Sequence, residues 1–391
     1  MLSREEMRQV ERSLANSDQD TRDEIGFLLL HQGFADRFFP GTSVLHTRIR
    51  YALFVPWLFQ RAASNRRRGA DLDATIRHLL IELAIRLKQL GKEPQDVIGG
   101  DKLRQLTSQP PDRVYWSALR TWGILLPGVE SRATALRRLD AGARSSALDD
   151  DGGKLNDEAT EVFVTLPPPP TGWESDKTPL HFKLLSAERK FLCNKLRLLT
   201  RSGDNAPSLL ARIVEAGRSF EGTLASLPKE LDAYADAADK LALRVARDAA
   251  ALAAIGRAVY GALVELLLAG DGGRDDRTFQ DQLHTHFAEY GEAAAHCDLD
   301  AAEKLLPDLP LHVKTVLRET QAYVRRETPE SFSCLHDSYK TAEKQRKSSR
   351  RARLLETAVQ RRAEWNPDRH NTSPLHYRWK VVRQMLADLN D

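Results

Sequence analysis

The feature that most constrains the fold is a long apolar run at residues 251–270, which reads ALAAIGRAVYGALVELLLAG. A run of this length and composition forms either a membrane-spanning helix or a helix inside a protein core. Arg257 and Glu265 interrupt it at positions where a single spanning helix would have to carry both charges through the hydrocarbon, which is costly. We therefore predict that this run is the central helix of a soluble bundle and that no segment crosses a membrane.

Helical signals dominate the rest of the chain, because apolar residues recur every three or four positions and alternating β-branched runs are almost absent. A clear example is residues 72–91, LDATIRHLLIELAIRLKQLG, in which Ile76 and the leucines form one apolar stripe. Asp71 or Asp73 can cap the start of this helix, and Gly91 ends it. The sequence therefore predicts a mostly α fold with little or no sheet.

Domain organisation follows from length and from one change in composition. A chain of 391 residues is too long for one ordinary domain, so we expect two. Around residues 146–180 an acidic run containing glycines is followed by four consecutive prolines at 167–170, a composition typical of a loop and an extended spacer. We predict an N-terminal helical domain at 1–145, a flexible Pro-rich linker at 146–180 that holds at most one short strand, and a C-terminal helical bundle at 181–391.

A basic segment stands out at residues 340–362. It carries nine basic residues against Glu343 and Glu356, whereas the whole chain is nearly balanced, with 58 basic and 55 acidic side chains. If the segment is helical, these charges are spread over about six turns. The nine basic residues are Lys340, Lys344, Arg346, Lys347, Arg350, Arg351, Arg353, Arg361 and Arg362.

Clustered cations of this kind neutralise nucleic-acid phosphates, and nearby aromatic rings such as Trp365 and Tyr377 offer stacking surfaces. Two other interpretations stay open, a solvated helix face and a contact with an acidic protein, and the spacing of Trp379 favours a place in the core. A second small patch lies in the expected loop before residue 71. The predicted binding residues are Lys344, Arg346, Lys347, Arg350, Arg351, Arg353, Arg361 and Arg362, with Arg66, Arg67 and Arg68 in the second patch.

The stretch FFPGTSVLHTRIRYALFVPW, residues 38–57, is apolar on nearly every side. Pro40-Gly41 is a turn signal, after which Thr42 or Ser43 can cap a helix. We predict a helix at 43–60 buried inside the N-terminal domain and kinked by Pro56.

Two arginines lie inside this apolar stretch. On a helix, Arg48 and Arg50 point about 200° apart, so each needs its own partner, because an unpaired buried guanidinium is very costly. The candidate partners are Asp23, Glu24 and Asp36. We interpret both arginines as structural buried charges, and phosphate or partner binding stays open as the alternative.

The three cysteines, Cys193, Cys297 and Cys334, do not form the paired framework of a secreted domain, and the first twenty residues contain charges and no apolar run. We therefore expect a cytoplasmic protein without a signal peptide.

No sequence pattern has the residue spacing that a metal or cofactor site requires. His284 and His286 are two positions apart on an expected helix, so they cannot hold one ion together. The sequence contains no G-x-x-x-x-G-K-[ST] motif for nucleotide phosphates. We expect no metal and no cofactor, and whether the chain is an enzyme is left open. A helix-turn-helix module at residues 101–124 is a further hypothesis.

The stretches TRDEIG (21–26) and FFPGTSVLHTRIRYALFVPWLFQ (38–60) make the chain resemble an uncharacterised bacterial family of unknown function. Weaker agreement follows at DRVYWSALRTWGI (112–124), RARL (351–354) and LHYRW (375–379). The resemblance implies relatives that accompany helicase and phospholipase-D-like genes in bacterial defence islands. It brings no established catalytic residues.

From the resemblance and the basic segment together we expect a non-catalytic subunit of a bacterial anti-phage defence or DNA-processing complex. Such a subunit contacts nucleic acid and a larger helicase or nuclease partner. The alternatives are a purely architectural scaffold that binds an acidic protein partner, and an enzyme of unrecognised chemistry.

Overall fold

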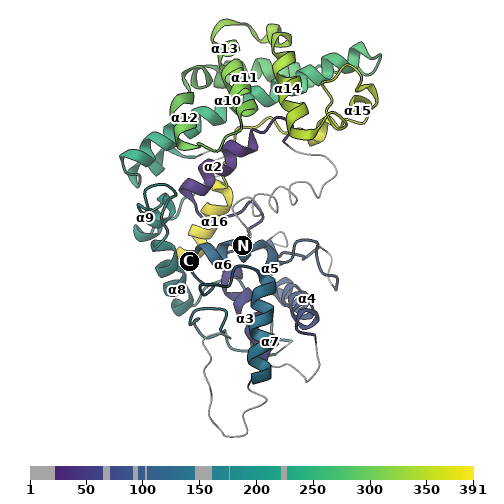
Figure 1. Cartoon of the computed structure of the whole chain (residues 1–391). Coiled ribbons are helices and arrows are strands. Elements are labelled where there is room, and N and C mark those ends of the chain that lie inside the picture. Colours follow the sequence, from purple (N-terminus) through teal and green to yellow (C-terminus); the bar gives the residue numbers. More distant parts are fainter. Residues whose placement is uncertain are drawn as a thin grey trace. The chain divides into compact units, whose positions relative to one another are not determined.

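The computed structural model describes residues 23–64, 71–90, 96–101, 104–145, 161–175, 177–221 and 227–391 of the chain (Figure 1). Arg66, Arg67 and Arg68 of the predicted second patch lie outside these residues. The helices are α2 (Leu28–Phe38), α3 (Tyr51–Ser64), α4 (Leu72–Leu90), α5 (Pro111–Val114), α6 (Trp116–Thr121), α7 (Arg132–Ser145), α8 (Ser186–Arg197), α9 (Leu209–Glu215), α10 (Ala237–Gly270), α11 (Thr278–His296), α12 (Leu299–Leu305), α13 (Leu311–Arg326), α14 (His336–Lys347), α15 (Val359–Ala363) and α16 (Trp379–Asn390), with 3₁₀ turns at Lys229–Ala233, Pro329–Leu335 and Pro367–Arg369.

The prediction of a mostly α fold is confirmed. Within the described ranges there is no extended strand, and β pairing is limited to two isolated antiparallel bridges, Leu125 with Phe163 and Thr200 with Pro207. The short strand expected after residue 160 forms only the first of these bridges.

The chain divides into two compact units, each built from separate stretches of sequence. Unit 1 consists of the described parts of Asp36–Gly222 together with Lys380–Asp391, and unit 2 of the described parts of Arg4–Ala35 together with Thr223–Trp379. This division differs from the predicted one, because residues 161–221 belong to unit 1 and the last twelve residues of the chain return to it.

The Pro-rich segment is bonded to the first helices of unit 1. Its backbone carbonyls accept hydrogen bonds from side chains of α3 and α4: Trp57 Nε1 donates to Pro167 O at 3.0 Å, and the Arg86 guanidinium donates to Gly172 O at 2.8 Å and Trp173 O at 3.0 Å. Trp173 itself is buried. The segment is therefore packed against the first helices of unit 1, through bonds that link residues far apart in sequence.

Helix α3 is buried on nearly every side, as its composition predicted, and Pro56 lies inside it. It begins at Tyr51 and not at residue 43, because the preceding turns are held by other bonds. His46 Nε2 lies 3.2 Å from Val114 O, and the Tyr115 hydroxyl donates to Arg48 O at 2.8 Å. Arg48 and Arg50 therefore precede the helix.

Unit 2 is organised around α10, whose 34 residues contain the apolar run. Helices α11, α12, α13 and α15 all pack against it, and Figure 1 shows α11 and α13 beside it. Among the described residues α10 alone is long and apolar enough to span a membrane, and 83% of its most apolar stretch is buried within the protein. The expected central helix of a bundle is thus what the structure shows.

The two charges of the apolar run have partners inside unit 2. The Glu265 carboxylate accepts from Phe279 N at 3.0 Å and Gln280 N at 3.3 Å, which satisfies free N–H groups at the start of α11. Arg257 donates to Ser373 O at 3.2 Å. Both charges inside the apolar helix therefore bind backbone groups of other segments of unit 2.

Candidate nucleic-acid interface

The nine basic residues of the segment 340–362 do not share one long helix. They lie on α14, on the surface loop 348–358, and on α15. Helix α14 ends at Lys347, where Ser348 takes a positive φ of 72°. We call residues 348–358 the basic loop.

Glu343 holds both the end of α14 and the basic loop. Its side chain is fully buried, and Oε2 accepts from Arg353 N at 2.9 Å and Leu354 N at 2.8 Å. Oε1 accepts from the Tyr260 hydroxyl of α10 at 2.6 Å and lies 3.5 Å from Lys347 Nζ. One buried carboxylate thus ties the loop backbone to α10 and compensates the charge of Lys347.

Arg362 closes the other end of the basic loop. It is 1% exposed, and its guanidinium pairs in bidentate fashion with Asp271, at 2.6 and 2.9 Å. The same fork donates to Arg353 O at 2.7 Å and Leu355 O at 2.6 Å. Arg362 is a structural cation, because its donors are used inside the protein.

Asp23 and Glu24 compensate Arg346 and Arg353, and Glu24 also lies near Lys347. Asp23 Oδ2 lies 3.3 Å from Arg346 Nη2, while Glu24 Oε1 lies 3.8 Å from both Lys347 Nζ and Arg353 Nη1. These carboxylates were the candidate partners of Arg48 and Arg50, and that assignment is wrong.

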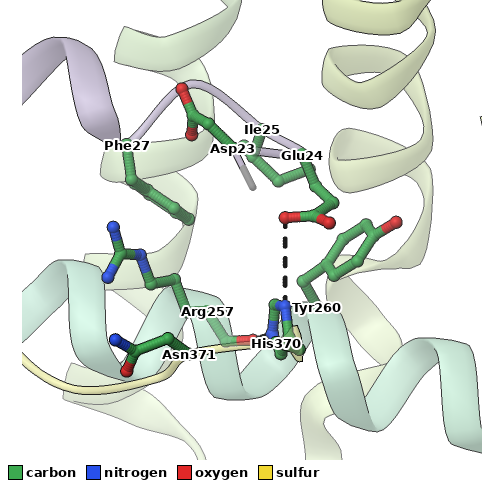
Figure 2. A pocket seen from close by; sticks show the side chains of 8 residues that line it. All are labelled: Asp23, Glu24, Ile25, Phe27, Arg257, Tyr260, His370 and Asn371. Carbon is green, nitrogen blue, oxygen red and sulfur yellow. Dashed lines mark hydrogen bonds and ion pairs between the residues drawn. The ribbon is translucent and has the colours of Figure 1, made fainter. Parts of the chain in front are cut away.

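Figure 2 shows the small pocket beside Glu24, with the Glu24–His370 pair drawn as a dashed line of 3.9 Å. Arg257 and Tyr260 reach it from α10, and its free space is about that of one water molecule. Burial lowers the pKa of His370, with Glu24 opposing the shift. A pocket of this size is part of the internal charge network and offers no room for a larger ligand.

The remaining basic residues of the segment face solvent. Lys344, Arg350 and Arg351 are exposed around the turn that joins α14 to the basic loop. Among the exposed cations, Arg361 pairs with Glu364 at 2.9 Å, and Arg351 also interacts with another residue. Lys340 is half-buried and pairs with Asp337 at 2.8 Å. The structure thus separates the predicted binding set into structural cations, Arg346, Lys347, Arg353 and Arg362, and an exposed group, Lys344, Arg350, Arg351 and Arg361.

The aromatic residues around the segment are mostly core residues. Tyr339, Trp365, Tyr377 and Trp379 are all buried. The core interpretation of Trp379 is confirmed, and these four rings are not available for stacking on bases.

Arg48 and Arg50 each have a partner of their own inside unit 1. Arg48 lies 2.7 Å from Asp388 and 3.0 Å from Asp96, and Asp388 also accepts from the backbone N–H of Ile49. Arg50 pairs with Glu188 at 2.7 Å with both side chains fully buried. Arg50 is fully buried, whereas Arg48 is half-buried, and the partners of both differ from those expected.

The cysteines do not form a reactive group. Burial raises the pKa of each thiol, that of Cys297 to about 12 and those of Cys193 and Cys334 by less, so they stay protonated at neutral pH. Within the described ranges no three His, Cys, Asp or Glu side chains gather as metal ligands would. The described part of the helix-turn-helix region, residues 101 and 104–124, contains the two short helices α5 and α6, with Val114 and Leu119 buried.

Sequence reasoning did not find Asp271, Glu24 and Glu343 as the residues that determine which cations are exposed. Two signals were present: TRDEIG places two acids together, and Glu343 is an acid inside a basic run. Neither signal tells which arginine it pairs with, because the partners are far apart in the sequence; Arg346, for example, lies 323 residues from Asp23.

Comparison with known families identifies the family of the chain. The family of unknown function DUF6361 matches residues 3–282, which is most of the chain, so the protein belongs to this family. The basic segment 340–362 lies beyond the matched residues. Comparisons with curated proteins and with solved structures gave no significant match.

Proposed function

We propose that this DUF6361 protein is a non-catalytic, nucleic-acid-contacting subunit of a larger bacterial complex, and that it contacts phosphates through Lys344, Arg350 and Arg351. The proposal rests on the difference between the buried and the exposed cations of the basic segment. Buried cations fix the basic loop from both ends, while exposed cations project from its turn. A loop held in this way loses little conformational entropy when it binds a phosphate backbone.

The number of exposed cations sets the strength of the expected interaction. Three phosphate contacts correspond to a slope of log K against log salt of about −2.7, or a loss of about 40-fold in affinity between about 50 and 200 mM salt. Because these contacts are to phosphates and not to base edges, binding should show little sequence preference.

The test compares the wild-type protein with the triple variant K344Q/R350Q/R351Q on a labelled DNA duplex and a labelled single strand at both salt concentrations. The matched control is K229Q/K240Q/R244Q, which removes three exposed cations elsewhere on unit 2. We expect the first variant to lose most of the affinity and most of the salt slope, and the control to keep both. Absence of wild-type binding at the lower salt, or equal binding by the two variants, contradicts the proposal.

The identity of the complex is part of the proposal. The resemblance described above points to anti-phage defence or DNA processing with a helicase or nuclease partner. The chain has no G-x-x-x-x-G-K-[ST] motif, so in our proposal a partner supplies any ATP-driven step. Affinity purification of the tagged protein from its native host tests this. A helicase or nuclease retained by the wild type and by K344Q/R350Q/R351Q alike supports a partner surface separate from the basic loop. A protein partner lost only by the triple variant, with DNA binding unchanged, supports the architectural scaffold instead.

A further inference from the structure

A second pocket, entirely within unit 1, lies where α8, α9 and α16 meet. Its cavity volume is about 230 Å³, which is slightly below the range of drug-sized ligand sites and is enough for a small ligand. Helix α8 contributes Arg189, Cys193 and Arg197, which are spaced four residues apart and so lie along one face. We call it the Arg189 pocket.

Most of the other lining residues are apolar. Val214 comes from α9, and Leu386 and Leu389 come from α16. All three are largely buried, yet they border the pocket, so a ligand placed there would cover apolar surface. This part of the pocket suits a short hydrocarbon group.

The two arginines of the pocket differ in their partners. Arg197 Nε lies 2.7 Å from the Glu215 carboxylate. Arg189 makes no side-chain hydrogen bond or ion pair with any residue that the structure describes, and its Nε is buried without a hydrogen-bond partner. A planar guanidinium that lines a pocket with unpaired terminal nitrogens binds carboxylate or phosphate oxygens in bidentate geometry. Arg189 therefore favours a ligand with an oxyanion group.

We propose that the Arg189 pocket binds a small amphipathic anion, with its carboxylate or phosphate group on Arg189 and its hydrocarbon group over Val214, Leu386 and Leu389. The proposal is independent of nucleic-acid binding, because every lining residue belongs to unit 1 and the basic loop belongs to unit 2. The ligand therefore has one charged group and one apolar group.

Cys193 serves as a reporter inside the pocket. It is half-buried and lines the site, whereas Cys334 is exposed elsewhere. Hexanoate is the probe, and alkylation of each cysteine by iodoacetamide is followed by peptide mass spectrometry in the full-length protein. We expect hexanoate to slow the alkylation of Cys193 in a saturable manner and to leave that of Cys334 unchanged. No protection of Cys193 at any hexanoate concentration overturns the proposal.

Two variants on α8 separate the role of Arg189 from a general effect of charge. R189Q should weaken hexanoate binding by about tenfold or more, since it removes a charge-assisted hydrogen bond. K190Q removes the neighbouring exposed charge outside the pocket and should bind hexanoate as the wild type does. Equal affinity of R189Q and the wild type overturns the assignment.

Two further probes define the chemistry. 1-Hexanol carries the hydrocarbon group without the anion and should protect Cys193 much less than hexanoate does. Equal protection by both contradicts an oxyanion site. Hexyl phosphate should also protect Cys193, and the tighter of hexanoate and hexyl phosphate identifies the source class, a carboxylic acid or a phosphate ester.

Discussion

Arg362 and Asp271, 91 residues apart in sequence, form a bidentate ion pair in which Nε lies 2.6 Å from Oδ2 and Nη2 lies 2.9 Å from Oδ1. Asp271 directly follows α10, and Arg362 lies on α15. Because the same guanidinium also donates to carbonyls of the basic loop, one side chain joins the end of the central helix, the loop and α15. This residue was predicted to bind a partner, and its donors are used within unit 2.

Replacing Arg362 should therefore destabilise the protein. R362M keeps much of the side-chain volume but leaves Asp271 and several carbonyls without a donor, and we expect a loss of about 2–3 kcal/mol in the free energy of unfolding. Urea denaturation measures it. The matched control is R361Q, which breaks an exposed pair with Glu364 and should cost about 0–1 kcal/mol. Equal stabilities of the two variants would show that the bonds of the buried Arg362 side chain contribute nothing.

The same pair should give the stability a dependence on acid pH. The hydrogen bond from Arg362 lowers the pKa of Asp271 below its ordinary value of 3.8, and burial opposes this shift only in part. Because the folded-state pKa is lower than the unfolded one, the stabilisation is present above pH 3.8 and is lost as the pH falls through the folded-state pKa. The difference in unfolding free energy between wild type and R362M should therefore shrink in acid. A constant difference across this range would disprove the linkage.

Arg50 and Glu188 form the corresponding pair in unit 1, with both side chains fully buried. R50M should cost about 3–5 kcal/mol, because it leaves the Glu188 carboxylate buried without its cation. R50K should recover little, since lysine lacks the fork that reaches His181 O at 2.6 Å and Glu188 at once. The double variant R50M/E188L should be more stable than R50M alone, as measured by chemical denaturation. A double variant that loses the sum of both single effects would contradict compensation within the pair.

Alanine should have opposite effects on stability at two helical glycines. A Cβ at Gly261 of α10 would overlap the ring of Phe279, so G261A should cost about 1–3 kcal/mol. A Cβ at Gly291 of α11 would meet no atom within 4 Å, so G291A should stabilise the protein by about 0.5–1 kcal/mol through helix propensity. Thermal unfolding of both variants measures these changes in stability. If G261A is as stable as the wild type, α10 and α11 can move apart at this point without a cost in stability.

The secondary structure was largely predictable because its signals are local. The stripe at Ile76 and the apolar run around Arg257 identified α4 and α10, since amphipathic or apolar periodicity reflects burial directly. The start of α3 was predicted eight residues too early. The turn signal and capping residues were real, but His46 and the backbone of Arg48 bond to a segment near Tyr115, and no local pattern reveals this.

The candidate site was predictable only in part. The sequence identified the basic segment, and charge density alone treated Arg350 and Arg362 as equivalent. In the structure Arg350 is exposed and Arg362 is buried. The Arg189 pocket had no sequence signal, because its lining comes from α8, α9 and the C-terminal helix α16.

The sequence by itself determined that this protein is built from helices, that 251–270 must be buried, and that positive charge gathers near residue 350. These properties follow from spacing and composition, which act over a few turns of chain. The tertiary structure alone decided where the units divide, which carboxylate compensates which arginine, and so which cations reach solvent. Those outcomes depend on pairs such as Arg362 and Asp271, which meet only after folding brings distant segments together, because the cost of burying a charge is offset only by a partner at hydrogen-bond distance.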